Sequence, residues 1–259
     1  MIRLPARGKA PSFLSSSKVK ATKKDIASKI KRGQSLAKSF PAHWLTKDVR
    51  GPLWKLHYGK CAYCERTREI KRESDVEHYR PKSAIMGHPG TGYWWLAYNW
   101  RNYLYACKPC NQGAKKTQFP LLSGGVRAKS PRDSLTAERP ALLNPFDDYP
   151  ERCLTYDWQH SNGALVKVLG LDDEGRGNRS IEILDLNRLT LMEERAEILD
   201  DLRIIAETML RALACGNVGP INRMGEIIAK KTSRKATFSG FRRNFFRSYG
   251  LNQYLAVEP

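Results

Sequence analysis

Two Cys-x-x-Cys pairs constrain the fold of this chain more than any other feature. The pairs are separated by 42 residues, and their members are Cys61, Cys64, Cys107 and Cys110. Two intervening residues let both thiolates of a pair bind one ion, and two such pairs complete a tetrahedral four-thiolate site. The site has no open coordination position, so the spacing predicts a structural Zn2+ that contributes folding free energy. Cys153 and Cys215 lie outside the pattern and are expected to be buried thiols.

The charge of the chain indicates a polyanionic partner. It carries 45 Lys and Arg against 26 Asp and Glu, a formal net charge of +19. A field of this sign attracts nucleic acid or an anionic membrane surface. No apolar run approaches the roughly 20 residues that span a bilayer, and the first twenty residues lack a secretory apolar segment. We therefore expect a cytoplasmic protein with reduced thiols.

Composition and periodicity divide the chain into three parts. A basic N-terminal arm (1–43) is either a solvated tail or partly helical from Lys23 to Lys38. Aromatic residues and both cysteine pairs fall in the second part (44–125). The third part (126–259) begins with a polar loop or linker that lacks any periodicity.

Within the third part, a hairpin and then helices are predicted. The hairpin has strands at about 153–158 and 164–169, joined through an Asn-Gly turn at 161–163. Apolar residues at spacings of three and four predict helices at about 189–213, 221–231 and 238–249. The phenylalanines of the last helix are expected to pack in a core. The predicted fold class is α+β, with a mainly helical C-terminal region.

The residues between and after the cysteine pairs resemble the HNH nuclease motif with its ββα-metal fold. The matching segments are DVEHYRPK (75–82), the stretch ending in Asn102, and CKPCNQ (107–112). The resemblance implies that His78 is the general base and Glu77 an acidic metal ligand. It implies that Asn102 orients the loop and the base, and that Asn111 binds the metal.

Glu77 departs from the pattern, because many members carry Asp there. The longer side chain shifts the carboxylate by one methylene, so Asp75, on the same strand face, is a second possible ligand. Either acid suits a Mg2+ or Mn2+ ion, which neutralises charge on a phosphate, and a neutral imidazole suits activation of water. Four flanking cations are candidates for holding phosphates, unless they are solvated surface charges: Arg80, Lys82, Lys115 and Lys116.

A longer likeness covers roughly residues 50–200. The segments KCAYCE, DVEHYRPKS, GYWWLAYNWRNYLYACKPCN, ALLNPFDD and LDLNRLTLMEER are similar to the Septu nuclease subunit family (PtuB) and its retron-associated HNH relatives in bacterial phage defence. In that family the nuclease acts with an ABC-like ATPase. The resemblance implies such a partner and a metal-dependent endonuclease that hydrolyses nucleic acid.

Other functions remain open from the sequence. A four-cysteine zinc module that binds nucleic acid without cutting it would not need His78 or Asn111. An effector that cleaves RNA, such as a tRNA, would use the same motif, although DNA is the favoured substrate. A restriction-type HNH enzyme would act without an ATPase.

Overall fold

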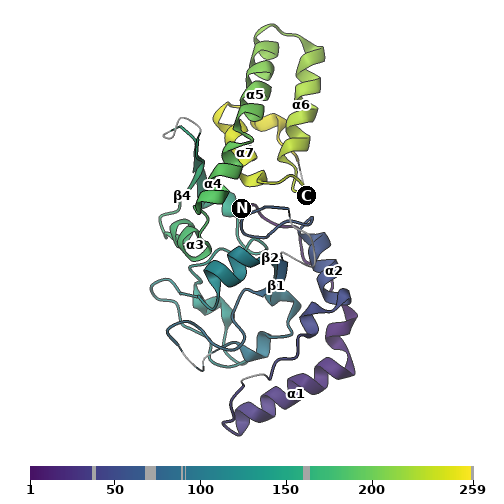
Figure 1. The fold of residues 1–259 in the computed structure, drawn as a ribbon, viewed down its shortest axis with the longest axis vertical. Helices are drawn as coiled ribbons and strands as arrows, with labels where there is room; N and C mark the ends of the chain where they lie inside the picture. The colour runs from purple at the N-terminus through teal and green to yellow at the C-terminus, as the bar shows by residue number, and fades with distance from the viewer. Residues whose placement is uncertain (37–38, 68–73, 89, 91, 160–163, 258–259) are drawn as a thin grey trace.

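The computed structural model describes residues 1–36, 39–67, 74–88, 90, 92–159 and 164–257. The helices are α1 (Ser17–Lys31), α2 (Lys47–Leu56), α3 (Arg176–Leu184), α4 (Leu189–Ala196), α5 (Leu199–Ala214), α6 (Val218–Thr232) and α7 (Ser239–Ser248). The strands are β1 (Ser74–His78), β2 (Tyr103–Cys107), β3 (Leu154–Asp157) and β4 (Lys167–Gly170). The molecule is elongated, with α1 at one end, the α5–α6 pair at the other, and β1 and β2 between them (Figure 1). None of the described helices is long and apolar enough to cross a membrane.

An antiparallel hairpin forms the centre of the structure. Strand β1 pairs with β2 so that Ser74 lies opposite Cys107 and His78 opposite Tyr103. All five residues of β2 are buried, and a helical turn, Pro109–Lys115, follows it directly. The two small sheets and the helices are compatible with the predicted α+β class. The strand–strand–helix order places the residues of β1 beside those of the helical turn.

The N-terminal arm packs against the rest of the protein. The ammonium group of Met1 forms an ion pair with Glu65 at 2.9 Å and donates a hydrogen bond to the Tyr156 hydroxyl at 2.9 Å. The backbone N–H of Leu4 donates to the Pro145 carbonyl at 2.7 Å. A solvated tail is therefore the wrong interpretation of these first residues. Helix α1 begins at Ser17, before the predicted start at Lys23, because the Ser16 side chain caps it, and it ends at Lys31.

The C-terminal helices differ from the prediction at one break. The predicted helix at 189–213 is two helices, α4 and α5, with a turn at residues 197–198. Buried Arg195 fixes α4 by donating to the carbonyls of Leu186 and Val166, whereas α5 packs along α6. The phenylalanines of the last helix are buried, as predicted. Cys215 was expected to be buried but is exposed, because α5 ends at the preceding residue.

The predicted hairpin and linker also take definite positions. Strands β3 and β4 form the hairpin, and its turn at 161–163 lies outside the described residues. The polar stretch 123–140 packs on the central hairpin region through fully buried Glu138. This carboxylate accepts hydrogen bonds from Arg80 Nε at 2.6 Å, from the Tyr93 hydroxyl at 2.5 Å and from the Ala128 backbone at 3.1 Å.

Buried His57 links α2 to β2 and should make stability depend on pH. Its Nδ1–H donates to the Leu53 carbonyl at 2.7 Å, and its Nε2 accepts the Tyr105 N–H at 3.3 Å. Burial is the main cause that lowers the pKa of His57 from 6.5 to about 3. Between these values the unfolded chain binds a proton that the folded chain does not bind. The stabilisation is therefore complete above pH 6.5 and declines by up to about 1.4 kcal/mol per unit as the pH falls.

The measurement is the free energy of unfolding in urea at several values between pH 5 and 7.5. We expect His57→Gln, which keeps a donor and an acceptor, to have a shallower slope than the native protein. Equal slopes in the two proteins would contradict this prediction.

Candidate active site and metal centre

The four cysteines of the two pairs meet in one buried cluster. Their sulfur atoms all lie within 4.8 Å of one another, and Cys64 Sγ is 3.7 Å from Cys107 Sγ. A tetrahedral zinc with Zn–S bonds of about 2.3 Å requires sulfur atoms about 3.8 Å apart. One pair lies in the turn after α2, and the other lies where β2 passes into the helical turn. The donor set and its spacing fit a metal such as zinc.

Arg188, which precedes α4, contacts the cysteine cluster. Both of its terminal nitrogens donate to Cys110 Sγ at 3.6 Å. Such donors stabilise thiolate charge around a bound metal. Arg188 lies 78 residues after Cys110 in the chain, and no local pattern in the sequence predicts this contact. The C-terminal region is thereby joined to the metal centre.

A pocket of about 250 Å3 collects most of the predicted site residues. Strand β1 contributes Asp75, Glu77 and His78, and the helical turn contributes Asn111 and Gln112. Trp44, Lys82 and Lys116 also line this cavity, and we call it the central pocket. Asn102, Arg80 and Lys115 do not line it.

His78 is held in a defined orientation and tautomer. Its Nε2 lies 2.9 Å from the Ala97 carbonyl oxygen, which can only accept, so Nε2 carries the proton and Nδ1 the lone pair. The rings of Trp44 and Tyr103 pack edge-on against the imidazole, with centroids at 4.7 and 5.2 Å. Burial, with Lys82 as the next cause, holds the pKa of His78 well below 6.5. The ring is therefore neutral at pH 7 and able to accept a proton.

Asp75 and Asn111 form the polar pair that opens on the central pocket. Asn111 Nδ2 is 3.3 Å from Asp75 Oδ2, and Gln112 Nε2 donates to the same oxygen at 2.6 Å. Asp75 is partly exposed, unlike its neighbours in β1. A carboxylate and an amide that converge in a pocket match the oxygen ligands that a hard divalent cation takes. The residues present therefore fit such an ion.

Glu77 has a different set of contacts. Its Oε1 lies 2.5 Å from Lys115 Nζ, and both side chains are almost completely buried. Burial raises the pKa of Glu77, and the nearby Lys115 charge opposes that shift. Lys115 also donates to the His78 carbonyl at 3.3 Å. The sequence leaves Lys115 either a phosphate contact or a solvated surface charge; in the structure it is fully buried and paired with Glu77.

Asn102 and Arg80 lie behind the central pocket. Asn102 Oδ1 accepts the Arg80 N–H at 2.9 Å, and its Nδ2 donates to the carbonyls of Arg80 at 3.0 Å and Leu96 at 3.3 Å. These bonds tie the chain after His78 to the segment before β2. Arg80 is one of the candidates for holding phosphate. In the structure its guanidinium pairs with Glu138 and does not line the central pocket.

Two of the four predicted basic contacts do line the central pocket. Lys82 Nζ lies 4.6 Å from the centre of a Trp44 ring, and Lys116 is exposed beside Asn111. Trp44 and Gln112 were not singled out from the sequence. Neither residue type is diagnostic by itself, and only the fold brings them to His78 and Asp75.

The fold and these sites define an α+β protein with a cluster of four buried cysteines that could hold a metal ion, and with a pocket lined by a carboxylate, an amide and a histidine. No protein-family model matches the chain. It is homologous to Septu proteins. It is 33% identical over 173 residues to Septu protein PtuB of Bacillus mycoides (strain KBAB4), which covers 65% of this chain and 56% of that protein.

Two further Septu proteins align over a shorter span. Septu protein PtuB of Bacillus thuringiensis is 32% identical over 147 residues, 56% of this chain and 44% of that protein. Septu protein PtuA of Bacillus mycoides (strain KBAB4) is 32% identical over 147 residues, 54% of this chain and 19% of that protein. The chain thus spans about half the length of the two PtuB proteins and about a fifth of the PtuA protein.

Proposed function

We propose that this chain is an HNH-type, metal-dependent endonuclease that hydrolyses phosphodiester bonds, with DNA as the favoured substrate. The observation that carries the proposal is the tautomer of His78. Its Nε2–H is bound to the Ala97 carbonyl, so Nδ1 carries the lone pair, and His78 lines the same pocket as Asp75 and Asn111. A neutral imidazole next to oxygen ligands is the pairing that general-base hydrolysis of a phosphodiester requires.

The roles of the residues follow from their contacts. Nδ1 of His78 accepts the proton of the attacking water, while Ala97 holds the ring in place. Asp75 and Asn111 hold a Mg2+ or Mn2+ ion, which when bound supplies positive charge for the phosphate oxygens and the leaving group. Glu77 lines the same pocket, where Lys115 pairs with it. Lys82 and Lys116 bind phosphate oxygens at the rim, and Asn102 positions the loop that carries Arg80.

The biological setting belongs to the same proposal. Homology to Septu proteins, including a PtuA protein, supports a role in anti-phage defence within a Septu complex. We place an ABC-like ATPase as the partner that controls the nuclease. The four-cysteine cluster binds a structural zinc that fixes the helical turn, which lines the central pocket, to the end of β2.

Cleavage by the purified, zinc-loaded protein tests the proposal. Plasmid, single-stranded DNA and total RNA are incubated with Mg2+ or Mn2+, with and without any ATPase that is encoded beside the chain. We expect the native protein to cut DNA and Asp75→Ala to need a higher Mg2+ concentration and to cut about 10- to 100-fold more slowly. Asp173→Ala, an exposed acid outside the pocket, is the matched control and should cut normally.

Three other outcomes would overturn the proposal or part of it. Cutting of RNA alone would make the chain an RNA-cleaving effector. Nucleic-acid binding without cutting in any condition would overturn the nuclease and leave a zinc-dependent binding module. Equal Mg2+ dependence in Asp75→Ala and Asp173→Ala would remove Asp75 from the ion site.

A further inference from the structure

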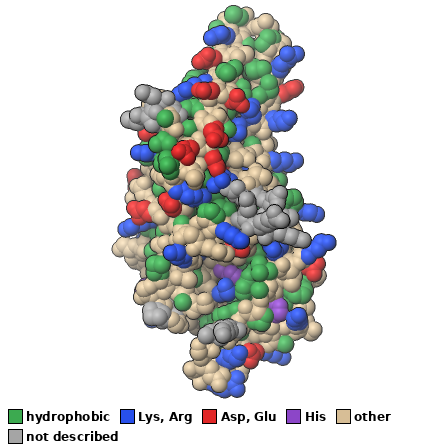
Figure 2. All heavy atoms as spheres, viewed as in Figure 1, with side chains coloured by type: hydrophobic (Ala, Val, Ile, Leu, Met, Phe, Trp, Pro, Cys, Tyr) green, Lys and Arg blue, Asp and Glu red, His purple; other side chains and the backbone are tan. Residues whose placement is uncertain are grey.

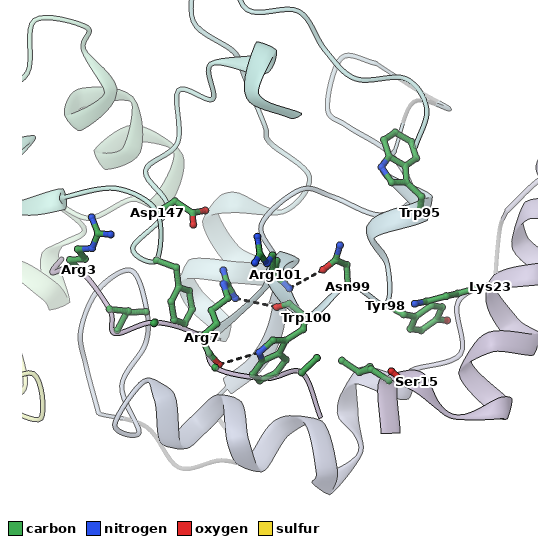
Figure 3. A pocket seen from close by; sticks show the side chains of 16 residues that line it. Arg3, Arg7, Ser15, Lys23, Trp95, Tyr98, Asn99, Trp100, Arg101 and Asp147 are labelled. Carbon is green, nitrogen blue, oxygen red and sulfur yellow. Dashed lines mark hydrogen bonds between the residues drawn. The ribbon is translucent and has the colours of Figure 1, made fainter. Parts of the chain in front are cut away.

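A second and larger cavity lies between the N-terminal arm and the segment before β2. It has a volume of about 930 Å3, and we call it the basic cleft. Its charged lining comprises Arg3, Arg7, Lys23, Arg101 and Asp147. Figure 3 shows Arg3 at one end of the cleft, Arg101 near the middle, and Lys23 at the other end. Trp95 and Tyr98 also line this cavity.

The arm that forms one wall of the basic cleft is fixed in place. Arg7 Nη1 donates to the carbonyls of Trp100, at 3.2 Å, and Tyr103, and Trp100 Nε1 donates back to the Arg7 carbonyl at 3.3 Å. The Arg7 guanidinium also lies 3.7 Å from the centre of the Phe146 ring. Figure 3 shows these reciprocal contacts crossing from the arm to the opposite wall. The cleft is therefore a built site, with a positive charge held at its base.

The cations at the rim are available to a ligand. Lys23 and Arg101 are exposed, and their side chains make no hydrogen bond or ion pair with the described part of the chain. The one carboxylate of the lining, Asp147, already accepts a hydrogen bond from Asn144 Nδ2 at 2.5 Å. Unpaired cations around a cavity attract an anion with several charges.

The basic cleft and the central pocket share an aromatic wall. Trp44 lines the central pocket, and Tyr98 lines the basic cleft. The Trp44 ring centroid lies 4.7 Å from that of His78 on one side and 5.8 Å from that of Tyr98 on the other. The Tyr98 ring therefore lies within about 10.5 Å of the His78 ring, which equals the axial rise of about three nucleotides of duplex DNA at about 3.4 Å each.

The distribution of acids over the surface agrees with this placement. Figure 2 shows acidic side chains gathered mostly in the upper half of the face that it presents, near α4 and α5, while the end formed by α1 carries mainly Lys and Arg. On the face that Figure 2 presents, a polyanion therefore meets fewer acidic side chains in the half that contains α1 than near α4 and α5.

We propose that the basic cleft binds the phosphodiester backbone of the nucleic-acid substrate a few nucleotides from the bond in the central pocket. Lys23 and Arg101 contact the phosphates, Arg7 supplies a fixed positive field, and the partly exposed Trp95 offers a ring on which a base stacks. The N-terminal arm is thus half of a substrate-binding site. The inference rests on the proposed function, because the central pocket supplies the reason for a nucleic-acid ligand.

Equilibrium binding of fluorescein-labelled oligonucleotides tests the inference. The protein carries His78→Ala to prevent cutting, and the probes are 30-nucleotide single-stranded DNA, duplex DNA and RNA. We expect Lys23→Ala/Arg101→Ala to weaken binding at least about tenfold at moderate salt. The slope of log K against log salt should fall by about 1.4 for single strands and 1.8 for duplex, as two phosphate contacts are lost. Both side chains are exposed and pair with nothing in the described ranges, so the fold should be unaffected.

The matched control removes the same charge from another place. Arg223→Ala/Lys230→Ala alters two exposed cations of α6, at the opposite end of the molecule from α1 (Figure 1). We expect it to change affinity less than about twofold. Equal losses in the two double variants would show an effect of net charge alone and overturn the inference. Unchanged oligonucleotide binding in Lys23→Ala/Arg101→Ala would also overturn it, as would a cleft that binds free ATP in preference to the oligonucleotides.

The test separates this inference from the proposed function. If the native protein cuts no nucleic acid but Lys23→Ala/Arg101→Ala binds oligonucleotides more weakly, the nuclease assignment fails and the assignment of the basic cleft stands. If the native protein cuts and the double variant binds normally, only the assignment of the cleft fails.

Discussion

Cys107→Ser should release the bound metal and leave the protein without a stable fold. The four buried sulfur atoms lie within 4.8 Å of one another, and Cys107 ends β2. Structural zinc in small modules contributes about 10 to 16 kcal/mol of apparent binding free energy, comparable to the 5 to 15 kcal/mol that stabilises a whole domain. Zinc content of the purified chain and its thermal unfolding curve measure the effect.

Cys215→Ser is the control for this prediction. Cys215 is an exposed thiol outside the cluster, so its replacement should leave one zinc per chain and shift stability by less than about 0.5 kcal/mol. A Cys107→Ser protein that retained one zinc and the native unfolding temperature would show that the cluster does not hold the fold together.

His78→Ala should lower the rate of metal-dependent cleavage by about 10²- to 10⁴-fold, the usual contribution of a general base. The physical reason is the fixed tautomer, in which Ala97 holds Nε2–H and Nδ1 is the proton acceptor. Single-turnover cleavage of DNA measures the rate of the chemical step without product release.

Two variants separate loss of the base from loss of the fold. His78→Gln keeps an N–H donor for the Ala97 carbonyl but has no basic nitrogen, so it should fold like the native protein and cut as slowly as His78→Ala. His88→Ala changes an exposed histidine outside the central pocket and should cut normally. Normal cutting by a folded His78→Gln protein would rule out His78 as the base.

The sequence predicted the parts of the structure that depend on spacing. The cysteine pairs come together as their spacing requires, and β1 presents Asp75 on the edge facing Asn111. Helical periodicity placed α6 and α7 within about three residues of their ends. The helices follow from apolar spacing within one segment, and the cysteine cluster follows from the two-residue spacing within each pair, so sequence patterns contain both.

Other features depend on contacts between distant segments. Lysine and arginine usually lie at the surface, so the sequence does not indicate that Lys115 and Arg80 are paired. The fold pairs Lys115 with Glu77 and Arg80 with Glu138. The break between α4 and α5 likewise follows from the bonds that Arg195 makes to the region of β4. A buried charge needs an oppositely charged partner, and here each partner lies far away in the sequence. Sequence patterns therefore indicate surface positions for these residues.

The contact between Arg188 and Cys110 has a consequence for how the protein is made. All four cysteines leave the ribosome before Arg188 does, and 78 residues separate Arg188 from the last of them. At 5 to 20 residues per second, this delay lasts about 4 to 16 s. The four thiols are therefore accessible to metal ions before Arg188, which donates to Cys110, has been synthesised.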